Sequence, residues 1–112
     1  MRTKIVYHES VRNQVREWIR RLSATEPGGE LIATIALNEL KTHLAEHHGE
    51  IPEAEKVQNL SPPTFWWQFT SETWISYVII DSGRWLWKKR RIVIISLGER
   101  PEDPGYSVVP HA

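Results

Sequence analysis

The 112-residue sequence contains no cysteine and has no excess of either charge. The absence of cysteine excludes thiol catalysis, Cys-ligated zinc and disulfide bonds, and it is compatible with a reducing cytoplasm. Lys plus Arg and Asp plus Glu number 14 each, so the overall charge does not predict a non-specific polyanion binder. The sequence has neither a signal peptide nor an apolar run of the roughly 18 residues that span a membrane. We therefore expect a cytoplasmic protein with no membrane partner.

Several catalytic motifs are also missing from the sequence. It has no Gly-rich phosphate loop, no Gly-x-Ser-x-Gly elbow and no His-Glu-x-x-His, which argues against nucleotide hydrolysis, the α/β-hydrolases and the zincins. His43, Glu46 and His47 are spaced for one face of a helix. The sequence places no third ligand beside them, and histidines are favoured at a helix C-terminus by its dipole. We expect no metal ion and no cofactor.

The spacing of apolar residues predicts a strand, two helices and then a group of strands. Residues 5–7 are β-prone, apolar stripes at helical spacing follow over residues 11–22 and 31–44, and residues 50–63 form a polar connector. Residues 64–69, 74–80 and 92–97 are typical of strands, and the last is expected in the centre of the sheet. We predict one α+β domain over residues 1–112. Its N-terminal strand and two-helix hairpin would pack on a mainly antiparallel, twisted sheet of about four strands.

The positive charge is concentrated in one segment. Residues 84–91 hold five cations and no acid, and two tryptophans alternate with Leu86 among them. Cations that follow a phosphate backbone and aromatics that stack on bases are typical of single-stranded nucleic-acid surfaces. If the segment is a strand, Trp85 and Trp87 share one face. A solubilising hairpin tip and a protein interface are the alternatives. The candidate RNA-binding residues are Arg84, Trp85, Trp87, Lys88, Lys89, Arg90 and Arg91.

The order of elements and three short motifs resemble the RelE/ParE superfamily of bacterial toxins, whose members pair with a small antitoxin. The motifs are Lys-Ile-Val-Tyr-His-Glu-Ser-Val at residues 4–11, Val-Gln-Asn-Leu at residues 57–60 and Ile-Ile-Ser-Leu-Gly-Glu-Arg-Pro at residues 94–101. The resemblance covers nearly the whole chain. It implies the toxin of a toxin–antitoxin module, with a cognate antitoxin as partner.

The resemblance also implies an active site. In members that cleave messenger RNA on the ribosome, an arginine just after the last glycine and a tyrosine a few residues later belong to that site, and Arg100 and Tyr106 hold these positions here. Arg100 would neutralise the scissile phosphate and Tyr106 would orient or stack the nucleotide. His111 or His8 could act as general base. The alternatives are a salt bridge for Arg100 and packing on the sheet for Tyr106.

The sequence departs from the cleaving members in two places. They carry lysines on the strand that residues 65–69 would form and an arginine near Ile75, and both are absent here. Our main hypothesis is a metal-independent, ribosome-dependent mRNA endonuclease that inhibits translation. It requires Arg100 and residues 84–91 to meet in one pocket. The departures and the neutral charge favour the alternatives, a ParE-like non-enzymatic inhibitor of DNA gyrase or a catalytically silent binding protein.

Overall fold

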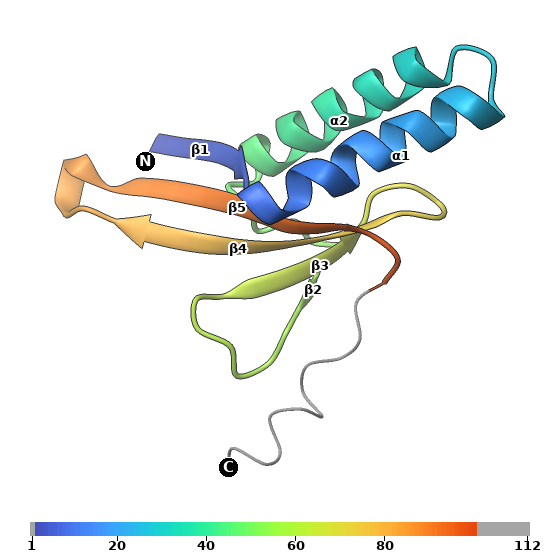
Figure 1. Ribbon diagram of the computed structural model, residues 1–112. Coiled ribbons are helices and arrows are strands. Elements are labelled where there is room, and N and C mark those ends of the chain that lie inside the picture. The colour runs from blue at the N-terminus through green and yellow to red at the C-terminus, as the bar shows by residue number, and fades with distance from the viewer. Residues whose placement is uncertain (1, 101–112) are drawn as a thin grey trace.

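The computed structural model describes residues 2–100, which form a five-stranded sheet with two helices on one face (Figure 1). The predicted α+β class is confirmed. In chain order the elements are β1 (Arg2–Tyr7), the 3-10 turn η1 (Glu9–Val11), α1 (Arg12–Thr25), α2 (Gly29–Glu46), β2 (Glu55–Lys56), β3 (Thr64–Gln68), β4 (Trp74–Ser82), the 3-10 turn η2 (Trp85–Trp87) and β5 (Lys89–Gly98).

The strands lie in the order β1-β5-β4-β3-β2. β1 pairs with β5 in parallel, and the other three pairings are antiparallel, as the mainly antiparallel prediction requires. The sheet has five strands instead of about four because β2 pairs with β3 inside the segment predicted as a connector. β5 has neighbours on both sides, which confirms the predicted central position of residues 92–97.

The two helices form the predicted hairpin and cover one face of the sheet (Figure 1). Their turn is tight because Gly29 lies against the carbonyl of Leu22, where a side chain would clash with the backbone. Between helices and sheet lies the core, which includes Trp18, Leu40 and Leu44 from the helices and Ile75, Tyr77, Ile92 and Ile94 from the strands. The buried Tyr77 hydroxyl donates a hydrogen bond to the Gly49 carbonyl at 2.7 Å.

Side chains of successive strand residues point to opposite faces of the sheet, and these two faces have different surroundings. Ile92 and Ile94 of β5 belong to the core beneath the helices, so Arg91 and Val93 project toward the opposite face. No helix among residues 2–100 covers that opposite face (Figure 1). Within the same residues, no helix is long and apolar enough to cross a membrane.

Candidate nucleic-acid interface

A groove of about 670 Å³ lies where β1, β5 and β4 run side by side. Parallel pairing sets Arg2 opposite Lys89 and Lys4 opposite Arg91, and paired residues share a face of the sheet. On the other side of β5, Ser82 and Ile80 are the partners of Lys89 and Arg91. The lining residues are Arg2, Thr3, Lys4, Ile80, Ser82, Lys89, Arg90 and Arg91.

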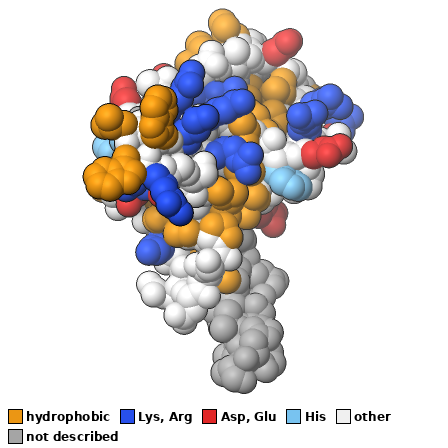
Figure 2. Space-filling view, turned by 90° about the vertical axis from the view of Figure 1, so that its left-hand side faces the viewer, with side chains coloured by type: hydrophobic (Ala, Val, Ile, Leu, Met, Phe, Trp, Pro, Cys, Tyr) orange, Lys and Arg blue, Asp and Glu red, His pale blue; other side chains and the backbone are white. Residues whose placement is uncertain are grey.

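No aspartate or glutamate is among these lining residues. Arg2, Lys4, Lys89 and Arg91 are all exposed, and we call these four the basic groove cations. Figure 2 faces this end of the molecule, and Lys and Arg side chains gather across the middle of the view. Like charges that converge without a counterion raise the local potential and attract polyanions. The neutral net charge of the chain therefore conceals a strongly basic surface.

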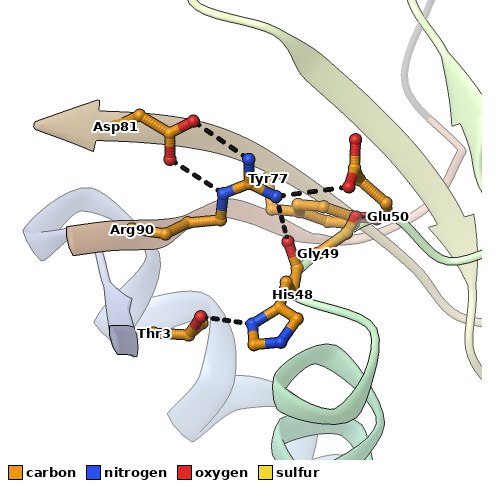
Figure 3. A network of polar contacts seen from close by, with 7 residues as sticks. All are labelled: Thr3, His48, Gly49, Glu50, Tyr77, Asp81 and Arg90. Carbon is orange, nitrogen blue, oxygen red and sulfur yellow. Dashed lines mark hydrogen bonds and ion pairs between the residues drawn. The ribbon is translucent and has the colours of Figure 1, made fainter. Parts of the chain in front are cut away.

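Arg90 differs from the sequence prediction, because its guanidinium is already occupied on the helix side of the sheet (Figure 3). Its side chain is 13% exposed and donates two hydrogen bonds to Asp81, at 2.8 and 2.9 Å. It also donates to the carbonyl of His48 at 2.9 Å and lies 3.4 Å from a carboxylate oxygen of Glu50. The hydrogen bonds from Arg90 lower the pKa of Asp81 below its usual range. Arg90 therefore stabilises the fold with hydrogen bonds that RNA would have to replace, and its role in RNA binding stays a prediction.

The turn between β4 and β5 carries Arg84 and the two tryptophans, but it is not a strand. Trp85, Leu86 and Trp87 form the 3-10 turn η2, and Trp85 has a left-handed backbone with φ +56°. The condition under which the two indoles would share one strand face is therefore not met. All three side chains project into solvent, with exposed fractions of 86%, 96% and 78%.

Arg100 lies at the other end of β5 from the basic groove (Figure 1). Its side chain is 48% exposed, and its guanidinium donates a 2.9 Å hydrogen bond to Glu55, on the edge strand β2. It also lies 5.1 Å from the ring centre of Trp66 and 5.2 Å from that of Trp74. β5 is 10 residues long, which corresponds to about 30 Å at the rise of a strand. The expectation that Arg100 and residues 84–91 meet in one pocket is wrong.

Of the other predicted catalytic residues, His8 alone lies among the residues that the structure describes. Tyr106 and His111 lie outside the described residues, and their roles stay predictions. His8 precedes η1 and accepts a 3.2 Å hydrogen bond from the backbone N–H of Ser10. Among residues 2–100, no three histidine, aspartate or glutamate side chains are placed to hold a metal ion.

Two of the basic groove cations, Arg2 and Lys4, were missed by sequence reasoning. They alternate with Thr3 at the start of a short strand, which is a weak signal by itself. Their significance depends on the parallel pairing of the first strand with the last, which joins residues almost 90 positions apart. Glu55 was missed as well, because it is one of several glutamates in a mainly polar connector.

Comparison with known proteins gives a likeness of fold. No protein-family model and no curated protein sequence matches the chain. A solved structure, a YoeB/ParE toxin from Agrobacterium tumefaciens, aligns with 88% of this chain and 99% of its own, at a TM-score of 0.57 and 16% sequence identity. The chain has the fold of the YoeB/ParE toxins. The predicted resemblance to the RelE/ParE superfamily is thus confirmed for the fold, and at this identity the likeness does not extend to activity.

Proposed function

We propose that this chain is the toxin component of a toxin–antitoxin module and that it inhibits translation by binding RNA on the ribosome. The observation that supports this most directly is the basic groove, whose cations face one hollow without a carboxylate. A phosphate backbone suits such a surface, because Arg and Lys neutralise phosphates and the condensed counterions are released. The fold likeness supports the toxin assignment, and the partner would be a cognate antitoxin that restores growth.

Metal-independent cleavage of messenger RNA on the ribosome is a second candidate function, in which the half-exposed side chain of Arg100 would act at its own end of β5, without the shared pocket that the sequence hypothesis required. Attack by the ribose 2′-hydroxyl builds negative charge on the phosphate, and a guanidinium can stabilise that charge. Glu55 competes for the same group at 2.9 Å, so a substrate phosphate has to displace it. Tyr106 would then orient the nucleotide and His111 would act as general base. Because of this competition, RNA binding stands first in the proposal and cleavage second.

Induced expression in bacteria without an antitoxin tests the proposal. The wild type is compared with a groove variant that combines Arg2→Gln, Lys4→Gln, Lys89→Gln and Arg91→Gln. We expect the wild type to stop growth and the incorporation of labelled methionine, and the groove variant to do neither. Arg12→Gln with Arg16→Gln, both exposed on α1, is a control at a different surface and should remain toxic.

The state of the transcripts and of the chromosome separates the candidates. Arrested translation with intact transcripts supports binding alone, whereas cut transcripts that disappear with Arg100→Ala support cleavage. DNA damage and filamentation with normal translation would identify a gyrase inhibitor and refute the proposal. Absence of toxicity at high expression, in cells that make folded protein, would refute it in favour of a silent binding protein.

A further inference from the structure

The tip of the β4–β5 hairpin, at one end of the molecule (Figure 1), holds three adjacent large apolar residues. Trp85, Leu86 and Trp87 are each more than three-quarters exposed, and we call them the apolar tip. Single exposed apolar residues are ordinary on protein surfaces, whereas a contiguous exposed group marks a contact site. We therefore expect the apolar tip to contact an apolar partner, because nothing in residues 2–100 covers it.

The shape of the tip is built into its backbone. Gly83 has φ +83°, and a side chain at this position would clash with the carbonyl of Trp87. Trp85 has φ +56°, a left-handed conformation that non-glycine residues rarely adopt. Backbone hydrogen bonds from Trp87 to Arg84 at 2.9 Å and from Lys88 to Trp85 at 3.3 Å close the turn. These features hold the apolar side chains outward instead of folding them back on the sheet.

The arrangement suits insertion better than base stacking. A stacking platform presents flat aromatic faces along one line, whereas here the two indoles are separated by Leu86 in a short turn where Trp85 has a left-handed backbone. Between them, Leu86 is the most exposed of the three at 96%, and leucine offers a base no aromatic face. A wedge of one aliphatic and two indole side chains is instead what enters the interfacial region of a lipid bilayer, where tryptophan is enriched.

The positive charges next to the apolar tip indicate that the bilayer would be anionic. The turn and the adjoining strands carry a basic collar, and the nearby acid, Asp81, is neutralised by Arg90. Figure 2 shows Lys and Arg side chains beside projecting hydrophobic ones at this end of the molecule. Clustered cations next to an apolar insertion supply the two signals that hold a protein at an anionic membrane surface. The collar consists of Arg2, Lys4, Arg84, Lys88, Lys89 and Arg91.

We propose that the apolar tip and its basic collar form a docking site for an anionic lipid membrane, with the tip inserted at the level of the headgroups. Such docking needs no membrane-spanning segment, but it departs from the sequence-based expectation that the protein has no membrane partner. The collar shares Arg2, Lys4, Lys89 and Arg91 with the basic groove. RNA and anionic lipid should therefore compete for the protein.

Vesicle flotation tests the proposal with the whole chain. We expect the protein to bind vesicles of phosphatidylcholine mixed with phosphatidylglycerol at least about tenfold more strongly than pure phosphatidylcholine vesicles. Replacement of Trp85, Leu86 and Trp87 by serine should weaken that binding by at least about tenfold. The matched control replaces Leu31, Ile32 and Ile35, which are 65%, 45% and 49% exposed on α2, with serine and should bind like the wild type.

Insertion is measured with lipids brominated on their acyl chains, which quench tryptophan fluorescence at short range. The wild type should be quenched on anionic vesicles. The variant with Trp85→Phe and Trp87→Phe should still bind but lose the quenching, because Trp18 and Trp66 are buried and the partly exposed Trp67 and Trp74 lie at the other end of the sheet. Trp74 pairs there with Gly98 and Trp67 with Ile75. This pair of results assigns the quenched signal to the tip.

Three results would overturn the inference. The first is that the wild type does not bind anionic vesicles. The second is that the serine tip variant binds them as well as the wild type does, and the third is that the wild type binds without quenching. Either of the last two results would indicate adsorption by charge alone. Loss of RNA affinity in the serine tip variant, without vesicle binding by the wild type, would identify the tip as an RNA contact instead. The RNA proposal fails separately, if the protein binds vesicles and the groove variant leaves RNA affinity unchanged.

Discussion

Neutralising Arg2 and Lys4 should weaken RNA binding in a way that salt dependence can quantify. If each basic groove cation contacts one phosphate of a single strand, log K against log salt has a slope of about −0.7 per contact, or about −2.8 for four contacts. Arg2→Gln with Lys4→Gln should reduce the slope to about −1.4. Because the electrostatic contribution vanishes near about 1 M salt, two lost contacts correspond to about 25-fold weaker binding at about 0.1 M, or about 1.9 kcal/mol.

The assay is fluorescence anisotropy with a labelled single-stranded RNA, repeated over a series of salt concentrations. Arg12→Gln with Arg16→Gln removes the same charge from exposed positions on α1 and should leave the slope near that of the wild type. Both groove residues are exposed on an edge strand, so the double variant should keep the unfolding midpoint of the wild type. Equal slopes for the wild type and this double variant would refute the reasoning, because RNA would then bind elsewhere.

Three further predictions concern stability and are measured by urea unfolding. Tyr77→Phe should lower the unfolding free energy by about 1–3 kcal/mol, because it leaves the buried Gly49 carbonyl without its hydrogen bond; an unchanged value would indicate that water replaces the hydroxyl. Gly83→Ala should cost about 1–2 kcal/mol through strain at a left-handed φ, and a neutral result would show that the turn relaxes. Asp81→Asn should cost about 1 kcal/mol near neutral pH, with screening by solvent taken into account. Since Arg90 lowers the Asp81 pKa from its usual 3.8, this stabilisation is complete above the unfolded-state pKa and is lost as the pH falls through the lower folded-state pKa. The wild type and the variant should therefore converge below about pH 3.8, and a constant difference would contradict the assignment.

The sequence predicts the elements of this fold better than their spatial relations. Helical periodicity identifies both helices, because burial of one face imposes that period on the residues. Runs of apolar, aromatic and β-branched residues identify β1, β3, β4 and β5. β2 escapes prediction because two residues, Glu55 and Lys56, are too few to carry a period. The 3-10 turn at Trp85 escapes it because a tryptophan with a positive φ opposes the usual preference for glycine.

Only part of the candidate site was predicted, again because the sequence shows local features and not spatial relations. Local charge density identifies the cations of residues 84–91 without knowledge of the fold. The sequence does not reveal which of them are available, since Arg90 is held by Asp81 across the hairpin while Arg91 faces the groove. Adjacent residues of a strand face opposite sides, so the register of β4 with β5 decides the role of each. That register depends on the whole sheet.

Two cations of the basic groove, Lys89 and Arg91, are close to Arg100 in the sequence but lie at the opposite end of β5. Lys89 and Arg91 begin the strand beside β1, whereas Gly98 ends it near the β2 edge, where Arg100 contacts Glu55. One bound phosphate cannot reach both ends of a strand of about 30 Å, but an extended RNA of several nucleotides can. If both ends act on the same RNA, shortening it below that span should remove the contribution of one end while the other still binds. The dependence of affinity on RNA length therefore distinguishes one continuous RNA site from a groove that acts without Arg100.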